Sequence, residues 1–205
     1  MDKFDVIVVG AGHAGIEAAT ASARMGLRTL IVTLKLDRVG YMSCNPSIGG
    51  LGKGHMVKEI DALGGEMGVA ADYSTVQFKR LNASKGPAVR GSRSQCDKKV
   101  YCDYMGDLIQ NYPNLQILQQ EVQSLILEKD RCAGVKLVDG SEIHSRALVL
   151  TTGTFMRAVM HIGLQRIEGG RVGEQATFGI SDQLLEFGFD ITRLKTGTPP
   201  RLDAR

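Results

Sequence analysis

The stretch GAGHAG, residues 10–15, matches the GxGxxG pattern of dinucleotide-binding turns. It directly follows an apolar, β-branched run from Phe4 to Val9, which is typical of a strand buried on both faces. The alanine-rich segment from Gly15 to Arg24 predicts a helix that packs closely on a sheet, and Gly26 is placed to end it. Because the glycines stand between this strand and this helix, they predict a phosphate-binding turn rather than a ligand-free one.

Each glycine of the turn has a physical role in such a site. The first, Gly10, permits a tight turn, the second, Gly12, lets the backbone approach a pyrophosphate, and Gly15 lets the helix pack closely on the strand. The candidate cofactor-binding residues are therefore the whole turn: Gly10, Ala11, Gly12, His13, Ala14 and Gly15. Thr33 ends the second predicted strand (27–33), where an acidic residue usually holds the ribose hydroxyls, so a hydroxyl or loop backbone group must make that contact.

The remaining pattern predicts an α/β fold. An ordered, glycine-rich loop is expected from Leu34 to Gly54. Helices are predicted over 56–63, 94–110 and 181–187, and strands over 115–128, 132–138, 142–150 and 191–194. A small antiparallel meander over about 115–145 that returns to the main parallel sheet favours FAD over NAD, because a nicotinamide-only domain would continue βαβ units. We expect a Rossmann-like FAD-binding fold of the glutathione reductase type, with residues 1–205 its truncated N-terminal part.

Composition narrows the class of protein. Hydrophobic residues make up 43% and charged residues 23%, and no apolar run is long enough to cross a bilayer. The charged start, Met1-Asp2-Lys3, has no signal-peptide pattern, so we expect a soluble, cytoplasmic protein without a membrane partner. The four cysteines form no CxxC pair and the four histidines are scattered, so the sequence predicts reduced thiols and no metal site.

Positive charge gathers in one stretch of the chain, although the net charge is only +3. Between residues 79 and 99 the only acidic residue is Asp97, and this stretch carries about +6. Its bases are Lys79, Arg80, Lys85, Arg90, Arg93, Lys98 and Lys99. A polyanion such as RNA could dock there, but a solvated charged face is the commoner explanation, and no aromatic platform is evident among the bases.

Cys44 is the candidate catalytic residue. It lies in MSCNPSIGG, residues 42–50, a loop after the second strand that can reach a flavin ring in this fold. Its thiol is a candidate nucleophile or redox group. The alternative is that the loop only shapes the flavin pocket.

Several stretches together resemble the glucose-inhibited division protein A family, also called MnmG. They include GAGHAGIEAA, MSCNPSIGGLGKGHMVKEIDALGG, LNASKGPAVRGSRSQ and LKTGTPPRLDAR. The resemblance implies an FAD enzyme that, with an MnmE-type GTPase, adds a carboxymethylaminomethyl or aminomethyl group to carbon 5 of the wobble uridine of tRNA. It implies NADH as the reductant of the flavin, methylenetetrahydrofolate as the one-carbon donor, and glycine or ammonium as the amine source.

The resemblance also assigns residues and partners. Cys44 matches a family cysteine proposed for catalysis, and the family's FAD contacts correspond to Gly10 through Gly15, Val122 and Thr177, the last as a hydroxyl where relatives have serine. It implies tRNA binding near 85–93 and a homodimer that forms a heterotetramer with the GTPase. This fragment alone is expected to be inactive.

Three other functions remain open from the sequence. The first is a folate- and FAD-dependent tRNA uridine methyltransferase, against which the SCNP loop and the KGPAVR stretch argue. The second is a flavin disulfide reductase, which would need a cysteine paired with Cys44. The third is a non-catalytic FAD-containing RNA-binding scaffold, in which RNA modification would not depend on Cys44.

Overall fold

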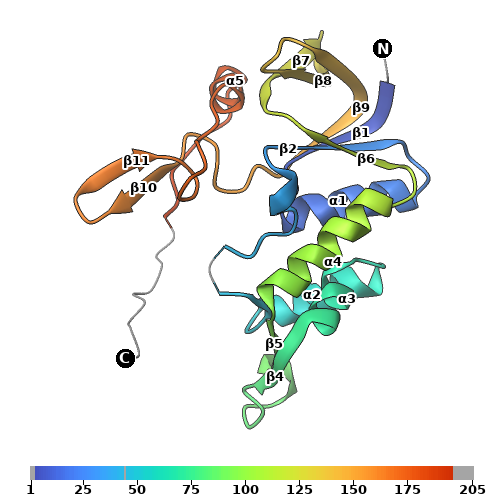
Figure 1. The fold of residues 1–205 in the computed structure, drawn as a ribbon, viewed down its shortest axis with the longest axis vertical. Coiled ribbons are helices and arrows are strands. Elements are labelled where there is room, and N and C mark those ends of the chain that lie inside the picture. The colour runs from blue at the N-terminus through green and yellow to red at the C-terminus, as the bar shows by residue number, and fades with distance from the viewer. Residues whose placement is uncertain (1–2, 44, 196–205) are drawn as a thin grey trace.

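The computed structural model describes residues 3–43 and 45–195. Its main sheet has six strands in the order β6-β2-β1-β9-β8-β7 (Figure 1). The central strand β1 (Lys3–Val9) is parallel to β2 (Thr29–Thr33) and β9 (Glu142–Leu150), and β2 is parallel to β6 (Leu115–Gln119). A first strand flanked by the second on one side and a later strand on the other is the order of dinucleotide-binding sheets, which confirms the predicted fold class.

The antiparallel part of the sheet begins later than the sequence predicted. β7 (Val122–Glu128) and β8 (Arg131–Leu137) pair antiparallel, and β8 pairs antiparallel with β9. The expected strand over 115–128 is two strands, because the backbone changes partners at its middle: Gln120 N bonds to Thr33 O, whereas Glu121 O accepts from Val138 N. Residues 115–119 therefore extend the parallel sheet, and the meander runs from 122 to 150.

Helices α1 (His13–Arg24) and α4 (Lys98–Asn111) cover one face of the sheet (Figure 1). The buried residues of α1 recur at helical spacing and are Gly15, Ile16, Ala19, Thr20 and Ala23. Gly26, with φ of +83°, follows the helix in the left-handed conformation that its position predicted. The predicted start of α4 at Ser94 was wrong, because residues 94–96 pair in a sheet and Asp97 caps the helix by accepting from the amides of Lys99 and Val100.

Between β2 and β6 the chain builds a separate unit that the sequence predicted only in part. It contains the 3₁₀ turn η1 (Leu36–Arg38), the helices α2 (Lys53–Ala62) and α3 (Met67–Ser74), the 3₁₀ turn η2 (Pro87–Val89) and a three-stranded antiparallel sheet of β3 (Ser47–Gly49), β5 (Gly91–Cys96) and β4 (Thr75–Leu81). Figure 1 shows β4 and β5 extending beyond these helices, away from the main sheet. We call residues 75–96 the β4–β5 arm.

After β9 the chain forms a small hairpin and a short helix. The hairpin consists of β10 (Val159–Ile162) and β11 (Gln165–Glu168), and α5 (Ile180–Glu186) follows, which confirms the predicted helix near 181–187. The Gln183 side chain ties α5 to β7 by bonds to the amide and carbonyl of Leu125, 2.6 and 3.1 Å long. The expected strand over 191–194 is wrong, since no regular structure forms there.

The two faces of the main sheet bury different side chains, which fixes the place of the glycine turn. Val6, Val8 and Ile31 face α1 and α4, whereas Ile7, Val9 and Val32 face the meander and α5. The turn after β1 is held between these two cores, at the carboxyl ends of the parallel strands, where open α/β sheets bind ligands. Among the described residues, no helix has the length and apolar character needed to span a bilayer.

Candidate cofactor site at the glycine turn

The three glycines of the turn are required for three different steric reasons. Gly10 has φ of +107°, and a Cβ there would lie 2.4 Å from the carbonyl oxygen of Thr151. A Cβ on Gly15 would lie 1.8 Å from the carbonyl oxygen of Gly10. A Cβ on Gly12 would meet no protein atom within 4 Å. Gly10 and Gly15 therefore allow helix and strand to pack closely together, whereas Gly12 leaves open space above its backbone.

That open space suits a phosphate. Gly12 is the N-cap of α1, no side chain caps this helix end, and the first bond back into the turn runs from Ile16 N to Gly12 O. Amides that precede such a bond point outward at the positive end of the helix dipole. Gly12 and Ala14 are exposed, so an anion can reach them. These residues fit the pyrophosphate of a dinucleotide.

Thr151 fixes the shape of the turn, a role that the sequence did not reveal. It follows β9, and its amide bonds to Val9 O at 2.9 Å. Its hydroxyl lies 2.8 Å from Val9 O and 3.1 Å from Gly10 O. The end of β9 is thereby joined to the end of β1 at the point where the chain turns toward α1. Only the parallel pairing of β1 with β9 brings these residues together.

His13, the first residue of α1, packs against Tyr101 of α4. Its Nδ1 lies 3.3 Å from the hydroxyl oxygen of Tyr101 on α4, and the two rings meet edge to face at 5.6 Å. Burial lowers the pKa of His13 from its ordinary value, and the nearby guanidinium of Arg171 lowers it further. The ring of His13 therefore packs the start of α1 against α4.

The other two expected FAD contacts lie on different parts of the fold. Val122 begins β7, and its side chain is buried in the same core cluster as Val9, so a ligand can reach only its backbone. Thr177 lies after the β10–β11 hairpin, where its amide bonds to Phe155 O and its carbonyl accepts from Arg157, each at 2.9 Å. Val122 follows the carboxyl end of β6, and Thr177 pairs with Met156, which follows the carboxyl end of β9.

Cys44 lies outside the described residues, but its neighbours on both sides are placed. The side chain of Asn45 accepts a bond of 3.2 Å from Gln95 on β5. On the far side of Pro46, Ser47 Oγ lies 3.4 Å from Nη2 of Arg93, which also approaches Gln95 Oε1. Polar side chains of β5 therefore anchor the SCNPS loop to the β4–β5 arm. The remaining cysteines, Cys96, Cys102 and Cys132, are free thiols.

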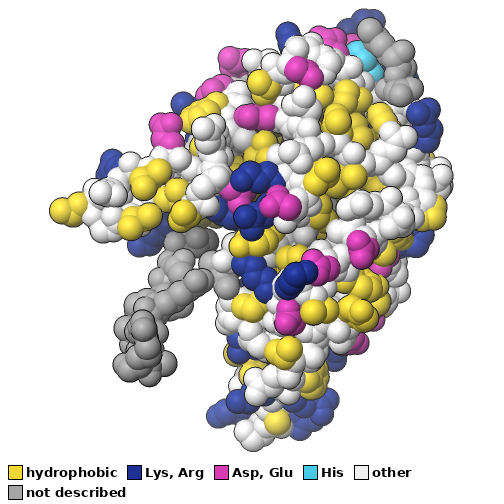
Figure 2. Space-filling view, in the orientation of Figure 1, with side chains coloured by type: hydrophobic (Ala, Val, Ile, Leu, Met, Phe, Trp, Pro, Cys, Tyr) yellow, Lys and Arg dark blue, Asp and Glu magenta, His cyan; other side chains and the backbone are white. Residues whose placement is uncertain are grey.

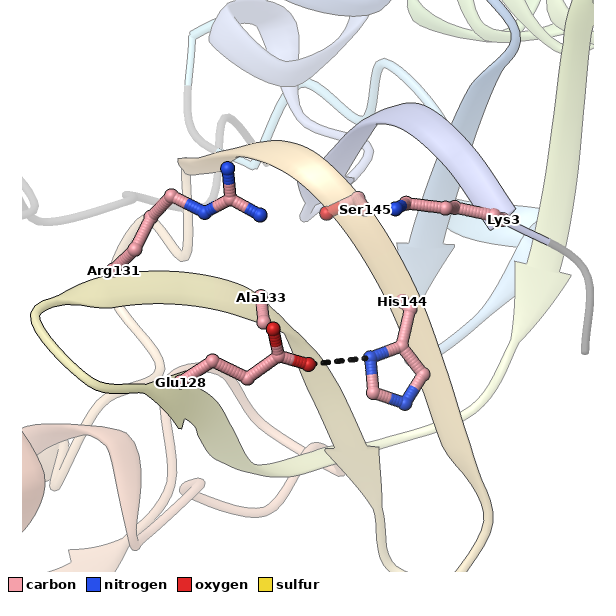
Figure 3. A pocket seen from close by; sticks show the side chains of 6 residues that line it. All are labelled: Lys3, Glu128, Arg131, Ala133, His144 and Ser145. Carbon is pink, nitrogen blue, oxygen red and sulfur yellow. Dashed lines mark ion pairs between the residues drawn. The ribbon is translucent and has the colours of Figure 1, made fainter.

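Two surface hollows lie far from the glycine turn. The smaller, about 200 Å³, is lined by Lys3, Glu128, Arg131, Ala133, His144 and Ser145 (Figure 3). Figure 3 shows Glu128 directed at His144, and their Nδ1 and Oε1 atoms are 3.9 Å apart. Lys3 is the first residue of β1, whereas the glycine turn follows the last residue of β1. This hollow therefore lies at the amino ends of the parallel strands, opposite the turn. Within residues 3–43 and 45–195, no three acidic, histidine or cysteine side chains gather as metal ligands.

The basic stretch divides into two places in the fold. Lys98 and Lys99 belong to α4, and Lys99 is paired with Asp103. The other bases lie on the β4–β5 arm, which contains no acidic residue, and they are Lys79, Arg80, Lys85, Arg90 and Arg93. In the space-filling view, basic side chains crowd the tip of this arm (Figure 2).

The register of the arm places like charges opposite each other. Lys79 on β4 is the direct partner of Arg93 on β5, an arrangement that destabilises a strand pair until an anion neutralises it. Phe78, which precedes Lys79 on β4, is 62% exposed, so the arm also presents an aromatic ring that the sequence did not mark as a platform. Because side chains alternate along a strand, this ring lies on the face of the arm opposite Lys79 and Arg93, the face to which Arg80 also points. The basic charge and the exposed ring suit a polyanion with unpaired bases.

Comparison with known proteins identifies relatives over nearly the whole chain. The family model described as glucose inhibited division protein A matches residues 5–205. The tRNA uridine 5-carboxymethylaminomethyl modification enzyme MnmG of Bdellovibrio bacteriovorus is 66% identical over 200 residues, which are 98% of this chain and 31% of that protein. The chain thus spans about a third of the length of this curated relative.

Solved structures also include a relative described as GidA. GidA of Aquifex aeolicus matches with a TM-score of 0.93 and 52% identity, over 97% of this chain and 33% of that one. A probable FAD-dependent monooxygenase of Pseudomonas aeruginosa matches with a TM-score of 0.53 and 14% identity, over 75% of this chain and 43% of that one. The second likeness concerns the fold alone.

Proposed function

Because the chain belongs to the glucose inhibited division protein A family, we propose that it forms the N-terminal part of the FAD-binding domain of a tRNA-modifying enzyme. The reaction proposed is the addition of a carboxymethylaminomethyl or aminomethyl group to carbon 5 of the wobble uridine. The observation that carries the cofactor assignment is the open backbone at Gly12, between two glycines whose packing leaves no room for a side chain.

The chain's own residues would hold FAD in three places. The backbone of the turn from Gly10 to Gly15 would bind the pyrophosphate at the start of α1. Val122 would contribute through its backbone and Thr177 through its hydroxyl. Thr33 ends β2, where a hydroxyl can take the ribose contact that an acidic residue usually makes. When bound, FAD supplies hydride transfer, the chemistry needed to reduce a one-carbon unit joined to uracil.

Cys44 is proposed as the nucleophile. Addition of its thiolate to carbon 6 of the uracil ring would make carbon 5 nucleophilic toward the one-carbon unit, and the thiolate would leave once carbon 5 had lost its proton. The bonds from Gln95 to Asn45 and from Arg93 to Ser47 support this role, because they hold the side chains of two residues that follow the thiol, one on each side of Pro46. Arg93 and Gln95 would therefore act as positioning residues.

The β4–β5 arm is proposed to contact tRNA. Its five bases face no acidic residue within the arm, so phosphates would release counterions on binding and give a strong salt dependence. Phe78 would add a stacking surface for an unpaired base. Because β5 carries both Arg93 and Gln95, which hold Ser47 and Asn45, tRNA docked on the arm would lie next to the residues that follow Cys44 in the chain.

The wider assembly follows from the family. We propose a cytoplasmic homodimer that joins an MnmE-type GTPase in a heterotetramer. NADH would reduce the flavin, and methylenetetrahydrofolate would donate the carbon. This chain alone would not complete the reaction, since its relatives are about three times as long.

The test is mass spectrometry of tRNA nucleosides from cells that lack the complete gene, complemented with wild type, Cys44→Ser or Cys132→Ser. Wild type should restore 5-carboxymethylaminomethyl or 5-aminomethyl uridine, and Cys44→Ser should not. Cys132→Ser is the matched control, because Cys132 is a free thiol on β8 in the meander and should leave the modification intact.

Other outcomes select the rival functions. If wild type restores 5-methyluridine in place of the aminomethyl derivatives, the protein is a uridine methyltransferase. If wild type changes no nucleoside yet the protein binds FAD and tRNA, it is a scaffold. Full modification with Cys44→Ser would remove Cys44 from the mechanism while leaving the reaction in place.

A further inference from the structure

Three basic side chains from distant parts of the chain converge on one aromatic ring. The Tyr41 ring centroid lies 3.8 Å from Nζ of Lys98, 4.5 Å from Cζ of Arg38 and 5.2 Å from Cζ of Arg171. Arg38 ends η1, Lys98 begins α4, and Arg171 follows the β10–β11 hairpin. The three charges lie within about one Debye length of one another, so they repel in the absence of an anion.

The acidic groups nearby only partly neutralise this cluster. Glu174 lies 3.9 Å from both Arg38 and Arg171, and Asp37 lies 3.6 Å from Arg38. All three distances exceed hydrogen-bond length, and Lys98 has no carboxylate partner among the described residues. Its ammonium instead lowers the pKa of the Tyr41 hydroxyl. Charge therefore remains in excess on the positive side.

One donor in the cluster makes no hydrogen bond, although carboxylate oxygens of Asp37 and Glu174 lie 3.6 and 3.9 Å from it. Nε of Arg38 is buried, and within the part of the chain that the structure describes it makes no hydrogen bond. A buried guanidinium N–H without an acceptor is costly, and native proteins rarely leave one. Asp37 and Glu174 stand at that buried N–H, and an oxyanion placed among the accessible ends of Arg38, Lys98 and Arg171 would neutralise the excess charge.

The cluster adjoins the glycine turn. The amide of Gly40, next to Tyr41, donates to Ala11 O at 3.0 Å, so the loop that carries Tyr41 packs directly on the turn. Arg38 and Arg171 are partly exposed, with 36% and 25% of their side chains accessible, so a ligand can reach them.

We propose that Arg38, Lys98 and Arg171 form a phosphate-binding site beside the glycine turn, in which Glu174 holds the two arginines in position. Glu174 suits this role because its side chain is only 9% exposed and lies equally far from both guanidiniums. The phosphate could belong to FAD or to the tRNA backbone. The site rests on the proposed function only for this choice of source.

The test compares Lys98→Met with Lys99→Met in the complete protein without FAD. Both substitutions remove one positive charge from the first turn of α4, but Lys99 pairs with Asp103 whereas Lys98 faces Tyr41. Isothermal titration with inorganic pyrophosphate should show about a tenfold weaker affinity for Lys98→Met and almost no change for Lys99→Met. Neither change breaks an ion pair of the arginines, so both variants should fold. Arg171→Met should weaken pyrophosphate at least as much as Lys98→Met.

Two further titrations identify the source of the phosphate. A matching loss of FAD affinity in Lys98→Met assigns the site to the cofactor, whereas unchanged FAD affinity with a tRNA salt dependence reduced by about one ion assigns it to RNA. Equal pyrophosphate affinity in wild type, Lys98→Met and Lys99→Met would overturn the proposal. This result is independent of the tRNA-modifying activity, because pyrophosphate binding requires neither turnover nor RNA.

Discussion

Alanine at Gly12 and alanine at Gly15 should have opposite effects on the protein. At Gly15 the new Cβ would lie 1.8 Å from Gly10 O and 2.8 Å from Thr151 Oγ1, so helix and strand must separate until both contacts exceed 3.0 Å. At Gly12 the new Cβ would meet no protein atom within 4 Å, and the residue has φ of −77°, which alanine adopts without strain.

The expected changes in stability follow from the packing around each glycine. Overpacking of this kind costs about 1–3 kcal/mol, and the roughly 1 kcal/mol that alanine gains over glycine inside a helix offsets only part of it. Gly15→Ala should therefore lower the thermal midpoint of the cofactor-free complete protein by several degrees. Gly12→Ala should leave that midpoint nearly unchanged, because surface substitutions without new contacts stay within about 0.5 kcal/mol.

Gly12→Ala, although it should leave stability nearly unchanged, should impair cofactor binding. A phosphate that approaches the Gly12 backbone would collide with the added methyl group, so Gly12→Ala should weaken FAD by about tenfold or more in a fluorescence titration. If Gly12→Ala binds FAD as tightly as wild type, no phosphate approaches this backbone and the cofactor site is misplaced. If Gly15→Ala is as stable as wild type, the close contact of α1 with β1 does not limit the fold.

Three further changes test the surroundings of the turn. Thr151→Val removes the hydroxyl that reaches Val9 O and Gly10 O, and it should cost about 1 kcal/mol, seen as a lower thermal midpoint of the cofactor-free protein. Because the pKa of His13 is lowered by folding, its stabilisation is present above the unfolded value of about 6.5 and is lost as pH falls below it. The midpoint of wild type should therefore fall more than that of His13→Gln on acidification, and parallel curves would refute this. Glu17→Ala leaves two amides at the start of α3 without their acceptor, at a cost of about 2 kcal/mol, and unchanged exchange of those amides with deuterium would contradict the role assigned to this carboxylate.

Local sequence patterns determined the parts of the fold whose contacts are close in the chain. The run from Phe4 to Val9, the glycine turn and the Ala-rich helix form one continuous βαβ start, and each step has a strong local preference. The turns near 130 and 140 likewise fixed β8 and β9, because hairpin turns depend on the residues within them. Gly26 ended α1 where it was expected, since only a left-handed residue suits that position.

Polar elements were missed because their stability comes from partners elsewhere. β5, with the sequence GSRSQC, has no apolar alternation, and it becomes a strand only by pairing with β3 on one side and β4 on the other. The same pairing moved the start of α4 from Ser94 to Lys98. β6 and β7 were predicted as one strand because both are apolar, and only their separate neighbours in the sheet divide them.

The candidate site shows the same division. The sequence predicted a tight glycine turn at residues 10–15 between strand and helix, because the backbone requirements of such a turn are local. Only the tertiary structure showed that the Thr151 hydroxyl bonds to the carbonyl groups at this turn. Only the tertiary structure likewise showed that Arg38, Lys98 and Arg171 surround Tyr41. The three bases are at least 60 positions apart from one another in the sequence, and their charges influence one another only after the sheet and helices have closed the distance.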